Sequence, residues 1–178
     1  MFNKVHHVTY VVPSIDQMAA YLEKYFGLKP IGIAVPPTPE GSLEPPAWGW
    51  KSLLYKIGDT LMDFTEPLVD ERGEAIVKRE PAMMFAKMLR ETGPGLFHVA
   101  WGVDDIDKIF GDLKGRGIKF TQGEHGSAVH ESAVGGYRVL NIDPREVGPT
   151  FANATSGCFF QVAEGEVVPM PGWRPTTK

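Results

Sequence analysis

The chain has 178 residues, of which 43% are hydrophobic and 22% are charged, and its formal net charge is −4. This length and composition predict a single globular domain and exclude a fibrous or disordered chain, and no stretch approaches the ~20 apolar residues that a bilayer-spanning helix requires. A mildly acidic chain without a basic cluster also makes nucleic acid an unexpected partner.

The first half of the chain predicts a strand, a helix and then three more strands. Residues 5–12 carry β-branched and aromatic side chains over the length of a strand. Ser14 stands where a helix N-cap is expected, and Gly27 stands where that helix should end. The later strands are expected at 29–34, 51–57 and 60–65. A proline-rich segment at 35–49 is expected to form a stiff lid.

The second half repeats this order after a linker. Pro81 is expected to start a linker helix over about 80–93. A strand that ends at Val103 is followed by Asp105, the expected N-cap of a helix that ends at Gly117. Further strands are expected at 118–121, 137–142 and 158–163, with a long loop at 123–136. The domain thus divides into module one (about 4–78), the linker helix, module two (about 95–165) and a C-terminal tail (166–178).

The two modules also match residue by residue, which indicates an internal duplication. The matched positions are His7 with His98, Val8 with Val99, Val12 with Val103, Ile15-Asp16 with Ile106-Asp107, and Asp63 with Gln161. Duplicated modules of this kind are expected to pair about an approximate two-fold axis. Side chains near that axis in one copy should therefore meet their counterparts from the other.

Two imidazoles, one carboxylate and one carboxamide are predicted to converge at this axis as metal ligands. They are His7, Asp63, His98 and Gln161. This set suits one divalent ion per chain, Co²⁺, Mn²⁺, Ni²⁺, Fe²⁺ or Zn²⁺, with positions left open for a chelating substrate. A lone strand histidine is more often structural, but two at matching positions favour ligands.

Strand alternation predicts which neighbouring side chains belong to the site. Thr9 shares the face of His7, whereas His6 should point to the opposite face and serve a structural role. Glu66 and Glu164 follow the ligand positions by three residues, so they are also expected on the opposite face, as solvated surface.

These residues resemble motifs of the vicinal oxygen chelate superfamily, and within it those of methylmalonyl-CoA epimerases. The motifs are His7-Val8 with Val12, Met62-Asp63-Phe64-Thr65-Glu66-Pro67, Gly95-Leu96-Phe97-His98-Val99 and Val103-Asp104-Asp105-Ile106. The resemblance implies an α+β fold in which two tandem βαβββ modules form a U-shaped mixed sheet around a central metal. It also implies a homodimer.

The chain departs from the family at both oxygen ligands. Gln161 stands where the family usually has a ligating glutamate, and Asp63 is shorter by one methylene than the usual Glu or Gln. The family also uses a glutamate before its third strand as a base. Glu40, in Pro39-Glu40-Gly41, resembles that motif, while Glu44 has the nearer spacing, so both join Asp63 as candidate catalytic groups.

Five residues are candidate substrate contacts: Thr9, Trp48, Trp50, His130 and Tyr137. The two tryptophans either line the pocket or anchor the first long loop. His130 lies in the second long loop, where polar side chains are usually only solvated. Arg138, which follows Tyr137, is a further candidate substrate contact.

The leading functional hypothesis is a metal-dependent epimerase or isomerase that removes a proton next to a carbonyl, with an acyl-CoA as one possible substrate. An Fe(II) dioxygenase is an alternative, since His7, His98 and Asp63 supply two histidines and a carboxylate. A glyoxalase-type lyase would need a thiol cofactor. A metal-free small-molecule binding or resistance protein is the non-enzyme alternative, and the paired histidines argue against it.

The expected partner is therefore a small molecule, with no nucleic acid and no membrane. The single cysteine, Cys158, allows no internal disulfide. The N-terminal residues lack a signal-peptide pattern, so a cytoplasmic protein is expected.

Overall fold

The computed structural model describes residues 2–33, 49–78, 80–122, 126–132, 136–143 and 159–167. In module one the elements are β1 (Phe2–Val11), α1 (Ile15–Phe26), β2 (Gly32–Ile33), β3 (Trp50–Ile57) and β4 (Thr60–Pro67). The linker forms α2 (Ala82–Glu91). In module two they are β5 (Gly95–Val103), α3 (Ile106–Gly115), β6 (Val129–Glu131), β7 (Tyr137–Asn141) and β8 (Phe159–Gly165).

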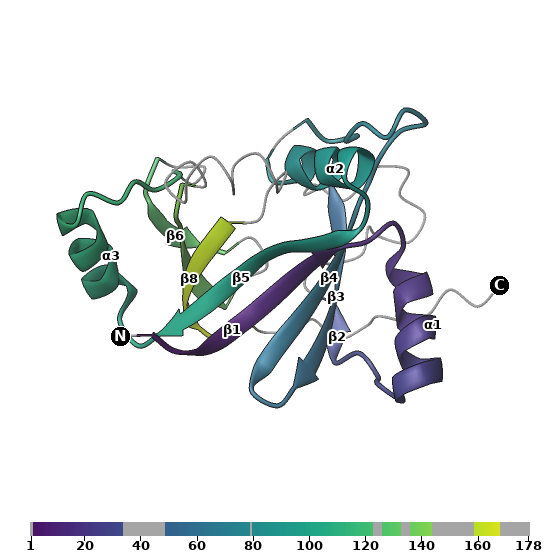
Figure 1. Ribbon diagram of the computed structural model, residues 1–178, viewed down its shortest axis with the longest axis horizontal. Helices are drawn as coiled ribbons and strands as arrows, with labels where there is room; N and C mark the ends of the chain where they lie inside the picture. The colour runs from purple at the N-terminus through teal and green to yellow at the C-terminus, as the bar shows by residue number, and fades with distance from the viewer. Residues whose placement is uncertain are drawn as a thin grey trace.

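All the strands join one mixed sheet in the order β2-β3-β4-β1-β5-β8-β7-β6. The first strand of each module lies at the centre, where β1 and β5 pair antiparallel (Figure 1). Each also pairs parallel with the last strand of its own module, β1 with β4 and β5 with β8. The sheet therefore consists of two equivalent halves joined edge to edge. The predicted α+β fold, in which two tandem βαβββ modules form one curled mixed sheet, is confirmed.

The helix ends follow the sequence signals. The Ser14 side chain accepts a hydrogen bond from the Gln17 amide, and Asp105 does the same for Lys108. Gly27 ends α1 with a φ of 64°, a left-handed conformation that glycine adopts without steric cost. Both predicted N-caps are therefore confirmed.

The outer strands differ from the prediction. Within the described part of the predicted strand 29–34, Gly32–Ile33 form β2 on β3, and the Ile31 amide also donates a hydrogen bond to the Leu54 carbonyl oxygen. The predicted strand 118–121 is wrong, because it contributes only a bridge between Phe120 and Ile142, whereas Val129–Glu131, inside the predicted loop, forms β6 on β7. Short edge strands are defined by the neighbour that they pair with, and their own residue pattern is weak.

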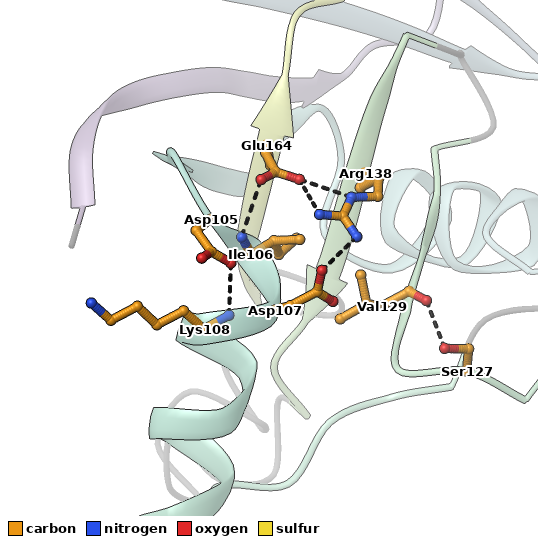
Figure 2. A network of polar contacts seen from close by, with 8 residues as sticks. All are labelled: Asp105, Ile106, Asp107, Lys108, Ser127, Val129, Arg138 and Glu164. Atoms are coloured by element: carbon orange, nitrogen blue, oxygen red, sulfur yellow. Dashed lines mark hydrogen bonds and ion pairs between the residues drawn. The ribbon is translucent and has the colours of Figure 1, made fainter.

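Glu66 and Glu164 do lie opposite the predicted ligands, but they are more than solvated surface. The Glu66 carboxylate accepts the backbone N–H of Ile15 at 2.9 Å, at the start of α1. Glu164 accepts that of Ile106 at 3.4 Å, at the start of α3 (Figure 2). Each carboxylate thus ties a helix N-terminus to the last strand of its module, where the helix dipole favours negative charge.

Each module has an equivalent apolar core between its helix and the sheet. Residues of α1, β3 and β4 form one core, and residues of α3, β7 and β8 form the other. A third core lies under α2, across one end of the sheet (Figure 1). Among the helices of the described residues, none is long and apolar enough to cross a membrane.

Candidate metal centre

Two rows of cross-strand neighbours in the middle of the sheet hold the predicted ligands. They are Asp63–Thr9–His98 and His7–Ala100–Gln161. Neighbours in a row point to the same face of the sheet, so the rows place all four predicted ligands on one face. The rows are counterparts under the duplication, because each has a histidine at one end and an oxygen donor at the other.

The two imidazoles are in contact at the centre of this face. His7 Nε2 lies 2.9 Å from His98 Nε2, and the side chains are 4% and 7% exposed. Two nitrogens bound at about 2.0–2.1 Å to one ion would lie roughly 2.9–3.4 Å apart for bond angles between square and tetrahedral. The histidine pair therefore already has the spacing of two ligands on one ion.

Burial keeps both imidazoles neutral. It lowers the pKa of His98 to about 3. Burial also lowers the pKa of His7 well below its usual value, and positive charge on His98 or His6 would lower it further. Metal ligation requires a neutral ring with a free lone pair, so the histidines are in the protonation state that a metal needs.

Asp63 is held by hydroxyl groups beside the histidine pair. Its Oδ2 accepts a hydrogen bond from Thr9 Oγ1 at 3.2 Å, and its Oδ1 accepts one from Thr65 Oγ1, also at 3.2 Å. Burial raises the pKa of Asp63 to about 6, although hydrogen bonds from Ser52, Thr65 and Thr9 act to lower it. A carboxyl group with this pKa can both accept and release a proton near neutral pH.

Thr9 stands between Asp63 and His98. Its hydroxyl oxygen lies 3.3 Å from His98 Nε2 as well as 3.2 Å from the Asp63 carboxylate. The short aspartate thus reaches the histidine pair through a hydroxyl bridge. Thr9, expected as a substrate contact, here positions the carboxylate.

Gln161 has the features of an unused ligand. Its side chain is 7% exposed, and its Nε2 donates a hydrogen bond to Asn141 Oδ1 at 2.8 Å. Its Oε1 is buried and has no hydrogen-bond partner among the described residues. An unsatisfied buried carbonyl oxygen is costly, so a cation at this position would remove the penalty. The contact with Asn141 fixes which end of the amide is left free.

These donors fit a divalent metal. Within the described ranges, no three His, Cys, Asp or Glu side chains are gathered into a closed metal site. The Asp63 carboxylate instead contacts the hydroxyl groups of Thr9 and Thr65. The two imidazoles and the Gln161 oxygen are therefore the candidate metal donors, and the Asp63 carboxyl group lies beside them.

The predicted orientation of His6 is wrong, since its ring lies against the site. His6 Nδ1 is 2.8 Å from His7 Nδ1, and the ring packs 4.9 Å from that of Tyr137. The cause is a break in register between Val5 and His7 in the pairing with β5, which interrupts strict alternation. Tyr137 itself lies beside both histidines, its ring 5.6 Å from that of His7.

The other candidates within the described residues lie elsewhere. Trp50 packs against Phe85 in the core under α2, which is the anchoring alternative. His130 sits on edge strand β6, with Nδ1 3.2 Å from the Ala128 carbonyl oxygen. Arg138 pairs with Glu164 and Asp107 on the opposite face (Figure 2). Glu40, Glu44 and Trp48 fall outside the described residues.

Comparison with known proteins identifies the family of this chain. A model of the glyoxalase/bleomycin resistance protein/dioxygenase superfamily matches residues 6–139. A hypothetical protein from Bacillus halodurans C-125 has 23% identity and a TM-score of 0.63, over 94% of this chain and 97% of that one. No curated protein matches the sequence.

Methylmalonyl-CoA epimerases are also among the similar structures. The Mycobacterium tuberculosis enzyme has 18% identity and a TM-score of 0.65, over 96% of this chain and 90% of that one. A Streptomyces coelicolor variant in complex with 2-nitronate-propionyl-CoA has 16% identity and a TM-score of 0.64, over 93% and 99%. At these identities the likeness concerns the fold.

Proposed function

Because the chain belongs to the glyoxalase/bleomycin resistance protein/dioxygenase superfamily, we propose that it is a metal-dependent epimerase or isomerase acting next to a carbonyl group. The observation that carries the proposal is the contact between His7 Nε2 and His98 Nε2, at 2.9 Å, beside a carboxyl group with a pKa of about 6. The first feature suits a metal and the second suits a base.

In this proposal His7, His98 and Gln161 would hold a divalent ion, which would supply Lewis-acid stabilisation of negative charge on the substrate oxygens. Asp63 accepts the proton from the carbon next to the carbonyl. The hydroxyls of Thr9 and Thr65 keep its two oxygens in place. Since burial raises the pKa of Asp63 towards neutrality, the captured proton can be released again without a large barrier.

Epimerisation also needs a group that returns a proton to the opposite face of the carbon. We propose Glu40 or Glu44 for this role, on the family resemblance of their segment. The substrate class proposed is an acyl-CoA or a similar acid with a proton next to a carbonyl. In its support, a structurally similar epimerase is in complex with methylmalonyl-CoA. A homodimer, testable by light scattering, is proposed on the same resemblance.

An Fe(II) dioxygenase is the second candidate, since two histidines and an aspartate are near one another. It would require Asp63 to leave its hydrogen bonds with Thr9 and Thr65 and become the third ligand. Oxygen uptake in the presence of Fe²⁺ would favour it over the isomerase.

The metal content of protein purified without chelators is the first test. We expect about one divalent ion per chain in the wild type and a large loss in His98→Ala. Val99→Ala, the neighbouring position on β5, is the control and should retain the metal. A wild type that holds no metal and takes up none of the five candidate ions would contradict the proposal.

The reaction is tested by deuterium uptake from D₂O into methylmalonyl-CoA, followed by mass spectrometry. Metal-dependent exchange at the carbon next to the carbonyls would support an epimerase on this substrate. A panel of other acyl-CoA thioesters extends the test. Metal bound without exchange on any of them would remove the epimerase assignment while leaving the metal site.

A further inference from the structure

A chain of polar contacts runs from the backbone of β8 to the predicted ligand His7. The carbonyl oxygen of Gly165 lies 3.1 Å from His6 Nε2, and His6 Nδ1 lies 2.8 Å from His7 Nδ1. His7 Nε2 then faces His98 Nε2 at 2.9 Å. The side chains of His6 and His7 are 3% and 4% exposed, so the protein itself determines where their protons lie.

The direction of each hydrogen bond follows from its far end. A carbonyl oxygen only accepts, so His6 Nε2 must carry the hydrogen that it donates to Gly165. His6 is buried, which favours the neutral imidazole, and a neutral imidazole has one N–H, so His6 Nδ1 is left as an acceptor. His7 Nδ1 must then be the donor in the 2.8 Å contact, so His7 Nε2 is left with its lone pair.

The start of this chain is fixed by the backbone. Gly165 has a φ of 108°, and a side-chain carbon there would lie 2.9 Å from the Gly136 carbonyl oxygen and 3.1 Å from Tyr137 Cα. Only glycine fits this approach, which directs the Gly165 carbonyl towards His6. The Tyr137 ring packs on both histidines and holds His6 in place.

Module two has a phenylalanine where module one has His6. The duplication places Phe97 at this position, and its ring packs against His98 and Phe85. The hydrogen shared between the two Nε2 atoms must be carried by His98, since His7 Nε2 is the acceptor. The two predicted ligands are therefore prepared differently.

We propose that His6 is a positioning residue that locks His7 in the Nδ1–H tautomer, so that the Nε2 lone pair of His7 faces the metal position before any metal binds. His7 would then be the preset ligand, and His98 the one that moves its hydrogen to Nδ1 on binding. The metal half of this inference rests on the proposed function, whereas the tautomer of His7 does not. Hydrogen bonds of this kind raise ligand basicity and fix ring orientation.

The tautomer is tested on the metal-free wild type by long-range ¹H–¹⁵N NMR of the histidine side chains. We expect a protonated Nδ1 and an unprotonated Nε2 for His7, and the reverse for His6. Finding the hydrogen on Nε2 of His7 would overturn the inference. This readout needs no metal and no substrate, so it distinguishes failure of the inference from failure of the proposed function.

Variants of His6 test the consequence for binding, with Co²⁺ as the probe and calorimetry as the readout. His6→Leu removes the acceptor and should weaken Co²⁺ binding about 10–100-fold, whereas His6→Asn offers an amide oxygen near the Nδ1 position and should recover most of it. Val11→Ala, buried on β1 away from the histidines, controls for lost stability and should bind Co²⁺ normally. Equal affinity of His6→Leu and wild type would overturn the inference.

Discussion

The two modules contribute equivalent strand positions to the site, but the side chains at these positions differ in their chemistry. In module one the short Asp63 carboxylate is bridged to His98 by the Thr9 hydroxyl, at 3.2 and 3.3 Å. In module two the counterpart of Thr9 is Ala100, which has no hydroxyl group and pairs across the strands with Gln161. Gln161 then has a buried oxygen without a partner in the described structure, and its nitrogen is tied to Asn141.

In a duplicated scaffold, equivalent positions can therefore carry groups suited to two different roles, proton transfer and metal binding. Module one has a titratable group surrounded by hydroxyl donors, which suits proton transfer. Module two has a neutral oxygen with a fixed orientation, which suits metal binding without added charge. The histidines come from equivalent positions and still differ, because His7 has His6 beside its Nδ1 atom, whereas Phe97 stands at the equivalent position next to His98.

Replacing the carboxylate should have the largest effect on activity. Asp63→Asn is expected to lower the proton-exchange rate by about 10²–10⁴-fold, because the base is removed, while Co²⁺ affinity changes by only a few fold. Deuterium exchange and calorimetry on the same preparation measure the two quantities. Parallel loss of exchange and of Co²⁺ binding would instead make Asp63 a ligand and remove the contrast between the modules.

The opposite pattern is expected at Gln161. Gln161→Leu should weaken Co²⁺ binding by about 10–100-fold, since one donor is lost from a site that otherwise keeps its shape. Gln161→Glu should bind at least as tightly as wild type, because it adds a negative charge at the same distance. Unchanged affinity in Gln161→Leu would show that the buried Oε1 does not face the metal.

Asn141→Ala tests whether the orientation of the Gln161 amide matters for metal binding. It removes the acceptor of the Gln161 Nε2 hydrogen bond, so the amide can rotate and its oxygen is no longer held in one direction. We expect Co²⁺ affinity to fall about 10-fold, less than or equal to the loss in Gln161→Leu. A double variant no weaker than Gln161→Leu alone would confirm that Asn141 acts through Gln161.

The stability of the metal-free protein should depend on pH through Asp63. Its pKa is about 6 in the folded chain and about 4 when unfolded, so the folded state binds the proton more tightly. The proton on Asp63 therefore stabilises the folded state fully below pH 4, and this stabilisation is lost as the pH rises through 6. The free energy of unfolding of Asp63→Asn, relative to that of wild type, should therefore increase by about 1–3 kcal/mol between pH 4 and pH 8.

Urea unfolding of both proteins with a chelator measures this difference. The buried histidines act in the opposite direction, because their lowered pKa values destabilise the folded state in acid. Their effect is common to both proteins and largely cancels in the comparison. A stability difference that does not change with pH would mean that Asp63 titrates normally.

The smallest effects are expected on the face away from the site. Glu66→Ala and Glu164→Ala each remove the acceptor for a helix N-terminal amide and should lower the free energy of unfolding by about 0.5–2 kcal/mol. Co²⁺ affinity should not change in either variant. A change in affinity would show that the helix attachments influence the site.

Four features could be predicted from the sequence alone: the duplication, the central strands, the helix caps and the pairing of His7 with His98. These follow from local periodicity, capping chemistry and the repeat, all of which are properties of the chain order. Strand alternation also correctly put Thr9 on the face of the histidines. The oxygen donors Asp63 and Gln161 were found because the duplication matched two unlike residues.

The contacts between these groups could not be predicted, because they depend on the tertiary structure. The break in register between Val5 and His7 brings His6 beside the site, and such a break depends on the strand that β1 pairs with. The same holds for Asn141 behind Gln161 and for Gly165 behind His6, since these partners meet across strands distant in sequence. Periodicity assigns a residue to one face of its own strand, whereas hydrogen-bond partners are assigned by register between strands.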